Sequence, residues 1–323
     1  AARVRLGTAD PVHVTQEALA LCHASQPRLN ALTLIDDSKA LAEAATIPAR
    51  MAAGEDLPLA GVPIVVKDNI WVGGWRITQG SRYFANHIAP RDALAVERAR
   101  KAGAVVLGIG HCPEFACKGL TRSPLYGTTH HPMDLSLTPG GSSGGNSAIV
   151  AAGAVPVSIG TDGGGSSRRP PAHCGLVGFK PSHGAIPHPF GFPEPFWWVT
   201  CIAPIARDVT DVALLFSAMS GPDARDPESL RMLAIRDEQP KALNIAFHPT
   251  LGLGAPVDDD VAEGFAKAMT ALRRAGFAMT ETAPVWPSAE DRSSLSAIQF
   301  AGLAAIHGAL YRADPEAMDP DVA

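Results

Sequence analysis

Cysteine is scarce in this chain of 323 residues, and its spacing excludes two common uses of the residue. The thiols form an odd set without a CxxC pair or Cys/His metal spacing: Cys22, Cys112, Cys117, Cys174 and Cys201. A disulfide framework or a zinc site would show such a pattern. We therefore expect free thiols, no metal site, and a reducing compartment, the cytoplasm.

Long apolar runs are also absent. No segment approaches the ~18 consecutive apolar residues of a membrane span, and the opening AARVRLGTADPVHV lacks the apolar core of a signal peptide. The net charge of -5 provides no surplus of Lys and Arg, which nucleic-acid surfaces require. These absences predict a cytoplasmic protein with neither a membrane nor a nucleic acid as its partner.

Nucleotide-binding motifs are missing as well. The chain contains no GxxxxGK(S/T) phosphate loop, and no GxGxxG stands between a strand and a helix. We therefore expect neither a phosphate-loop site nor a nicotinamide site. Hydrophobic residues make up 46% of the chain and charged residues 18%, which is ordinary for a globular protein with a substantial core.

Two loops of small residues are the most informative feature that is present. Residues 138–147 read TPGGSSGGNS and residues 160–168 read GTDGGGSSR, and an apolar segment separates the two. Glycine adopts conformations closed to other residues and leaves backbone N–H groups accessible. A flexible linker would not carry an apolar segment between its halves. We interpret the pair as two catalytic loops, each of which presents a serine.

Short apolar runs alternate with Ala-rich stretches, which predicts an α/β fold. The β-branched run in GVPIVVKDN predicts a strand that ends at Lys67. Further strands are expected within 102–110 and 155–162, and helices at 15–24, 92–102 and 143–153. Strand ends are common ligand sites in such folds. The Pro-rich stretch 187–204 is expected to form a loop at the edge of a pocket, where Trp197 and Trp198 either stack on a substrate or pack on the body.

Three separated motifs together resemble the amidase signature family of serine amide hydrolases. They are GVPIVVKDN at 61–69, the first serine loop at 138–147, and GTDGGGSSRRPPAHCGLVGFKPSHG at 160–184, in the family's order and at its spacing. The resemblance implies an α/β amidase-signature fold, with a central mixed β-sheet covered on both faces by α-helices. It also implies a single domain over residues 1–323 that lacks its C-terminal part, because family members are longer.

The resemblance implies a catalytic triad of Lys67, Ser142 and Ser166. Cleavage of an amide needs a nucleophile and a base that later protonates the leaving nitrogen. By resemblance Ser166 is the nucleophile, Lys67 the base, and Ser142 the proton shuttle, held by a cis peptide after Gly141. Lys67 must be neutral to act as a base, and burial beside apolar residues lowers a lysine pKa.

The glycines before Ser166 are expected to provide the oxyanion hole. Successive N–H groups of Gly163, Gly164, Gly165 and Ser166 form a concavity suited to a negative oxygen. The family often has Thr at position 163. The implied reaction is hydrolysis of a linear carboxylic amide, a small molecule, through an acyl-enzyme on Ser166, with no cofactor. A second copy of this chain is a candidate partner.

Two arginines follow the proposed nucleophile. We expect Asp162 and Arg168 to hold the turn by pairing with each other or with loop carbonyls. Arg169 then either grips an anionic group of the substrate or forms a solvent-facing or internal salt bridge to the protein.

Two alternative functions use the same residues. Gly140, Ser142 and Gly144 fit GxSxG, the nucleophile elbow of α/β-hydrolase esterases, with Ser142 as nucleophile. An elbow follows a buried strand, however, and residues 133–140 are polar and contain a proline. The other alternative is an amidotransferase-type subunit that hydrolyses glutamine and passes ammonia to a partner. Ammonia release from simple amides by the isolated protein would distinguish a stand-alone amidase from such a partner-dependent protein.

Overall fold

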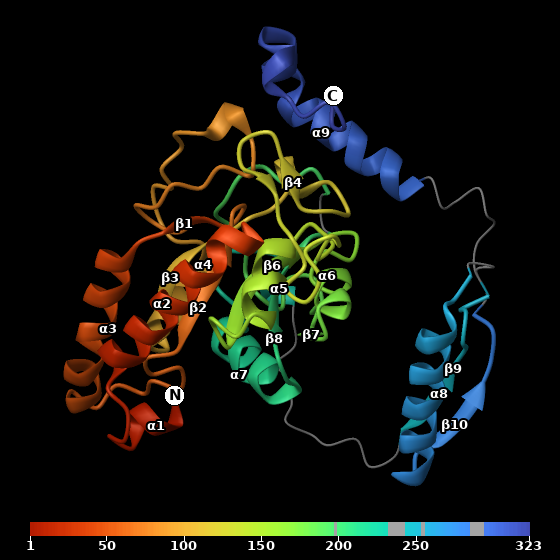
Figure 1. Cartoon of the computed structure of the whole chain (residues 1–323), viewed down its shortest axis with the longest axis horizontal. Coiled ribbons are helices and arrows are strands. Elements are labelled where there is room, and N and C mark those ends of the chain that lie inside the picture. Colours follow the sequence, from red (N-terminus) through yellow and green to blue (C-terminus); the bar gives the residue numbers. More distant parts are fainter. Residues whose placement is uncertain (197–198, 232–242, 253–255, 285–293) are drawn as a thin grey trace. The chain divides into compact units, whose positions relative to one another are not determined.

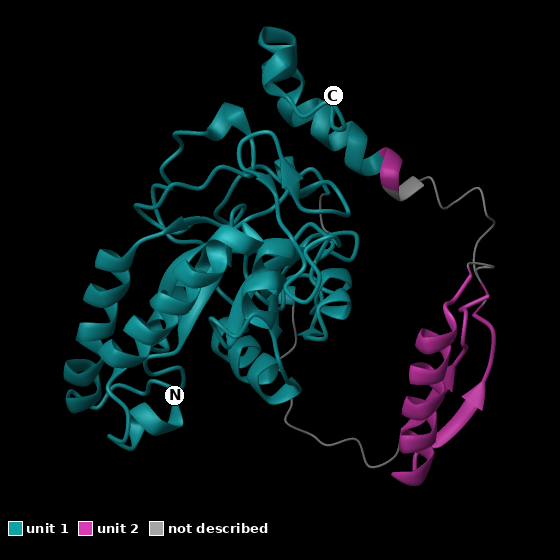
Figure 2. Cartoon of the chain, viewed as in Figure 1, with its two compact units in different colours: residues 1–234, 298–323 teal, residues 235–297 magenta. Residues whose placement is uncertain are grey.

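The computed structural model describes residues 1–196, 199–231, 243–252, 256–284 and 294–323. The chain divides into two compact units, one formed by residues 1–234 and 298–323 and the other by residues 235–297 (Figure 2). The single domain expected over residues 1–323 stays a prediction. Within the described residues, none of the helices combines the length and the apolar character needed to cross a bilayer.

A six-stranded mixed sheet forms the centre of the first unit (Figure 1). Its order is β1-β3-β2-β6-β8-β7. The parallel neighbours are β3, β2 and β6, whereas β1, β8 and β7 run antiparallel to the strands beside them. The strand bounds are Leu32–Ile35 (β1), Pro63–Lys67 (β2), Val105–Gly110 (β3), Val157–Asp162 (β6), Val177–Gly178 (β7) and Cys201–Ala206 (β8).

Helices cover both faces of this sheet, as the resemblance implied. Successive side chains of a strand point to opposite faces. In β2, Val65 packs with α2, α3 and α5, whereas Ile64 and Val66 pack with α4 and α7. The helices of this unit are Ala2–Arg5 (α1), Pro11–Leu29 (α2), Asp37–Ala52 (α3), Leu94–Lys101 (α4), Gly144–Ala151 (α5), Arg169–His173 (α6) and Val209–Met219 (α7).

The expected strands and helices are confirmed. One helix is longer than predicted, and the stretch 187–204 predicted as a loop ends in a strand. The helix expected at 15–24 runs from Pro11 to Leu29, because the Asp10 carboxylate caps its first turn and Asn30 ends it in a left-handed conformation. The Pro-rich stretch is a loop only as far as residue 200. Its last residues belong to β8, where Pro204 lies opposite Ile159 of β6. Trp197 and Trp198 lie outside the described residues.

Shorter elements surround the sheet. The two-residue strands Arg122–Ser123 (β4) and Gly127–Thr128 (β5) form a small antiparallel ladder. Single 3₁₀ turns are Arg82–Phe84, Glu114–Ala116, Ser229–Arg231 and Pro315–Ala317.

The last helix is Ser294–Ala313 (α9). Its Leu303 packs against Phe115, and the ring of its His307 stacks on the ring of Phe115 at a centroid distance of 3.9 Å.

The second unit contains one β-α-β arrangement. Its strands Asn244–Phe247 (β9) and Ala278–Glu281 (β10) pair in parallel, and Asp259–Arg274 (α8) connects them. A parallel pair requires such a crossover.

Candidate active site

The expected base and shuttle meet at one edge of the sheet. Lys67 is the last residue of β2, and the neighbouring parallel strand β6 ends beside it at Asp162. The Lys67 Nζ donates to Ser142 Oγ at 2.6 Å and to Thr161 Oγ1 at 2.8 Å. Both Lys67 and Ser142 are buried. The lysine therefore has hydroxyl partners and no carboxylate partner among the described residues.

Burial changes the protonation of this lysine. Removal of the ammonium from water lowers the pKa of Lys67 from 10.5 to about 8, although the negative charges of Asp162 and Glu194 oppose the change. At pH 7 a minority of Lys67 is therefore in the neutral amine form, which can accept a proton.

The first serine loop continues into α5, which begins at Gly144. The peptide bond between Gly141 and Ser142 is cis. Gly141 packs against the backbone of another loop, and a Cβ at this position would lie 2.7 Å from the nitrogen of Leu120. A larger residue at position 141 would therefore push Ser142 away from Lys67.

Ser166 lies at the more open side of the site. It is 8% exposed, compared with 1% for Ser142. Its carbonyl oxygen accepts the N–H of Ser143 at 3.3 Å, which ties the two serine loops together. Within the described part of the chain, its hydroxyl makes no hydrogen bond to Ser142 or Lys67. The structure thus joins Lys67 to Ser142 directly and leaves the hydroxyl of Ser166 available.

Asp162 organises the turn that carries Ser166. Its buried carboxylate accepts two hydrogen bonds from Arg168, both 2.9 Å long, which confirms the expected pair. It also accepts the N–H groups of Gly165 at 2.8 Å and Ser167 at 3.0 Å. Burial raises the pKa of Asp162, but these hydrogen bonds outweigh it, so the pKa lies below its ordinary value.

The position of Gly165 corrects one expectation. Its N–H donates to Asp162 and is not free to bind an oxyanion. The residue has a φ of +109°, which favours glycine, and this conformation turns the chain around the carboxylate. The N–H groups of Gly163, Gly164 and Ser166 have no acceptor among the described residues, so three of the four expected donors remain.

Arg169 lies beside both serine loops. Its Nη2 is 3.4 Å from the carbonyl oxygen of Gly141, and a Cβ on Gly165 would lie 3.3 Å from its Nε. The side chain is exposed, and no carboxylate forms an ion pair with it in the parts of the chain that are described. The alternative of an internal salt bridge is therefore not found among these residues.

Sequence reasoning missed Thr161 and Asn69. The hydroxyl of Thr161 accepts hydrogen bonds from Lys67 and, at 3.0 Å, from Asn69 Nδ2. The signal lies in the strand pattern, because parallel neighbours end at the same edge of a sheet and Thr161 is the penultimate residue of β6.

The surroundings of Ser142 do not match a nucleophile elbow. An elbow joins a strand directly to a helix, but residues 131–143 contain no strand. Over the described residues, no group of three or more His, Cys, Asp or Glu side chains is arranged to hold a metal ion.

Comparison with known proteins agrees with the motifs. The sequence profile named Amidase matches residues 13–313. A glutamyl-tRNA(Gln) amidotransferase subunit of Deinococcus radiodurans is 46% identical over 227 residues, covering 70% of this chain and 46% of that protein. An acylamidase of Rhodococcus erythropolis is 37% identical, over 88% of this chain and 61% of that protein.

A solved structure shows the same fold. A bacterial aryl acylamidase of the amidase signature enzymes superposes with a TM-score of 0.87 at 27% identity, covering 99% of this chain and 69% of that one. The chain spans about half the length of the curated relatives it matches. The matched profile, the relatives and the fold lead to one conclusion: the chain belongs to the amidase signature family.

Proposed function

We propose that the protein hydrolyses a linear carboxylic amide, a small molecule, in the cytoplasm through an acyl-enzyme on Ser166. The observation that carries this proposal is the buried Lys67 amine at 2.6 Å from Ser142 Oγ. Neutral Lys67 takes a proton from Ser142 as Ser142 takes one from Ser166, and Ser166 Oγ attacks the carbonyl carbon. The N–H groups of Gly163, Gly164 and Ser166 stabilise the oxyanion.

The same relay works in reverse for the leaving group. When the tetrahedral intermediate collapses, the C–N bond breaks and the proton held by Lys67 passes through Ser142 to the nitrogen. Water then attacks the acyl carbon as it gives up a proton to the relay. The bond between the acyl carbon and Ser166 Oγ breaks, the relay returns the proton to Ser166 Oγ, and the acid is released. Asp162, Arg168 and Gly165 hold the turn in place throughout. No step requires a metal or an organic cofactor.

Arg169 is proposed as a substrate-binding residue. Its guanidinium is exposed, lies beside Gly141 and Gly165, and is free of ion pairs within the described residues. A guanidinium binds a carboxylate with two hydrogen bonds. The arrangement supports an anionic group on the part of the substrate that lies beside Arg169.

A second candidate function follows from one comparison. The Deinococcus protein that shares 46% identity belongs to an amidotransferase, which supports ammonia transfer to a partner protein instead of release. The first half-reaction, attack by Ser166 on an amide, would be the same. Ammonia released from simple amides by the isolated protein supports the stand-alone amidase.

Labelling of the nucleophile tests the proposal. A fluorophosphonate probe should modify Ser166, and mass spectrometry of the digested protein should locate the adduct there. Ser166→Ala should abolish labelling and amide hydrolysis. The exposed residue Ser38 provides a matched control, since Ser38→Ala should keep both. An adduct on Ser142 would contradict the mechanism and favour the esterase alternative.

A further inference from the structure

A cavity of about 210 Å³ lies beside the loop of the proposed oxyanion hole, within the first unit. Its polar lining comes from the loop before β8 and from the turn at 226–228: His183, His188, Glu194, Thr200, Asp226 and Glu228. A cavity of about 150 Å³ is enough to hold benzene. This one therefore has room for a chain of several carbons with a polar end.

Two contacts place the cavity next to the reacting centre. A Cβ on Gly163 would lie 2.8 Å from Thr200 Oγ1, so the hydroxyl that lines the cavity touches the oxyanion loop. Cys201, a further lining residue, is the register partner of Asp162 in the β6 and β8 pair. Thr200 and Cys201 thus place the cavity beside the loop that leads to Ser166.

The lining contains polar atoms without partners. The Nδ1 of His183 and the Nε2 of His188 are buried, and neither has a hydrogen-bond partner among the described residues. A buried polar atom without a partner costs ~1 to 3 kcal/mol. Burial lowers the pKa of His188 to about 4, so its imidazole is neutral at pH 7. A neutral imidazole has one nitrogen that accepts a hydrogen bond.

The charged side chains of the lining are all acidic, and no Lys or Arg lines the cavity in the described part of the chain. Both oxygens of Asp226 already accept backbone N–H groups, from His188 at 2.9 Å and from Glu228 at 3.1 Å. This carboxylate is therefore occupied in holding the turn.

Glu194 accepts one backbone N–H, whereas Asp226 accepts two. It accepts the N–H of Phe196 at 3.0 Å through Oε1 and also interacts with the hydroxyl of Thr200. A carboxylate offers about four lone-pair sites on its two oxygens, so sites remain for a ligand. Burial raises the pKa of this carboxyl group, and a cation bound beside it would favour the charged form. Glu194 is the acceptor best placed for a ligand.

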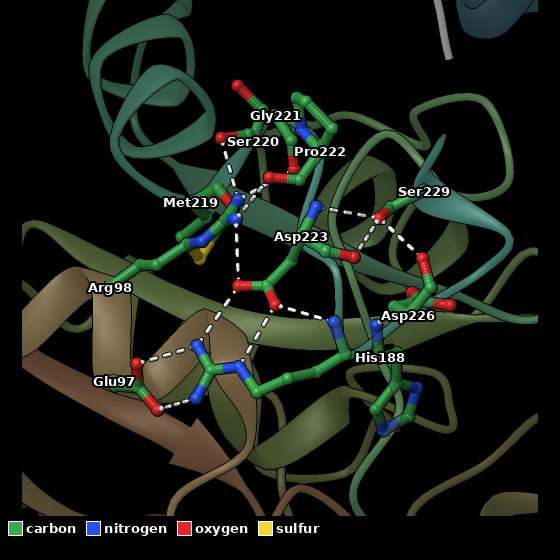
Figure 3. A network of polar contacts seen from close by, with 11 residues as sticks. Glu97, Arg98, His188, Met219, Ser220, Gly221, Pro222, Asp223, Asp226 and Ser229 are labelled. Atoms are coloured by element: carbon green, nitrogen blue, oxygen red, sulfur yellow. Dashed lines mark hydrogen bonds and ion pairs between the residues drawn. The ribbon is translucent and has the colours of Figure 1, made fainter. Parts of the chain in front are cut away.

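A polar network holds the turn that carries Asp226, one of the residues that line the cavity (Figure 3). The guanidinium of Arg98 donates to the carbonyls of Met219, Ser220 and Gly221 at the end of α7. It also contacts Asp223, whose turn is tied through Ser229 to Asp226. This turn is therefore built in advance of binding, which reduces the entropy lost when a ligand is ordered.

We propose that this cavity is a substrate subsite that selects an acyl chain ending in an ammonium group, with Glu194 as the residue that determines this specificity. The proposal rests on the proposed amide hydrolysis. When ammonia is the leaving group, only the acyl chain has atoms to place in the cavity. An ammonium supplies three donors, which match the oxygens of Glu194 and the accepting nitrogen of the neutral His188.

A matched series of amides tests the subsite. The kcat/KM for 5-aminopentanamide should exceed that for hexanamide, which has a methyl in place of the ammonium, by roughly 10- to 100-fold. Glu194→Gln keeps the shape and the bond to Phe196, so it should remove most of this preference. Because the variant also removes a negative charge that acts on Lys67, the readout is the ratio of the two kcat/KM values. Glu17→Gln, on a surface side chain that is 65% exposed, is the control and should change neither value.

Binding supplies a readout that does not need turnover. Titration calorimetry of pentylammonium with Ser166→Ala protein should show binding that weakens about tenfold or more when Glu194→Gln is added. Equal kcat/KM for the two amides, or pentylammonium affinity that ignores Glu194, would overturn the subsite. If no amide is hydrolysed but pentylammonium binds through Glu194, the proposed reaction fails and the subsite stands.

Discussion

The pKa of Lys67 sets the pH dependence expected for the reaction. The folded pKa of about 8 lies below the ordinary value of 10.5, so the neutral base becomes more abundant as pH rises through 8. The kcat/KM should therefore fall about tenfold for each pH unit below that value and level off above it. A profile of kcat/KM against pH checks this, and a flat profile between pH 6 and 9 would exclude Lys67 as the base.

An arginine at this position provides the matching variant. Lys67→Arg keeps a cation but cannot supply a neutral base, since guanidinium stays protonated at any working pH. Its kcat should drop by roughly 10²- to 10⁴-fold, the usual contribution of a general base. Retention of most activity, measured at pH 9, would show that another group accepts the proton.

At the level of single residues, the sequence predicted part of the site. Lys67 and Ser142 were expected from the resemblance of three motifs to a family, and their side chains lie 2.6 Å apart; their catalytic roles stay a prediction. Gly165 could not be assigned, because whether an N–H points at a ligand or at Asp162 depends on the dihedral angles of the whole turn. The sequence gives no indication of the role proposed for Glu194, because that role depends on a cavity formed with residues distant in the chain.

The turn after β6 offers a test with two neighbouring arginines. Arg168→Ala leaves the buried carboxylate of Asp162 without its two side-chain donors. The unfolding free energy should fall by about 1.5 to 3 kcal/mol, toward the lower value because Arg168 is 52% exposed. Denaturant unfolding followed by circular dichroism measures the change.

Arg169→Ala is the control for stability and the test for binding. The exposed side chain has no ion pair in the described residues, so stability should stay within about 0.5 kcal/mol. The variant should instead lose kcat/KM for a carboxylate-bearing amide and keep that for its neutral analogue. Equal losses on both substrates would make Arg169 part of the scaffold.

Among the elements, the long apolar ones were predictable and the short ones were not. The strand β3 and, before Lys67, the strand β2 are apolar because helices bury both of their faces. The two-residue strands β4, β5 and β7 exist only through pairing with partners that the local sequence does not specify. The start of β8 was not predicted, because Pro204 lies within it. A proline argues against a strand unless the strands beside it are known.

For the first unit as a whole, Asp319 binds to the loop at 114–118. The Asp319 carboxylate pairs with Lys118, and its N–H donates to Glu114 at 2.6 Å. Asp319→Ala leaves the ammonium of Lys118, which is 11% exposed, without its buried partner. The unfolding free energy should fall by about 3 kcal/mol, and thermal unfolding of the whole chain measures it.

Asp321 provides a control two residues away. It contacts the same lysine at 3.2 Å, but its side chain is 53% exposed. Water and salt screen such a pair, so Asp321→Ala should leave the melting temperature nearly unchanged. If both variants lowered the melting temperature equally, burial would not strengthen the ion pair between Lys118 and Asp319.

The attachment of Asp319 to the loop at 114–118 also bears on synthesis. A ribosome makes the chain from its N-terminus at about 5 to 20 residues per second, so Glu114 emerges well before Asp319, which is 205 positions later. During that interval the loop that supports Gly141 is exposed to chaperones and proteases. Nascent chains stalled before position 319 should therefore be cleaved in this loop, and those stalled well beyond it should be protected.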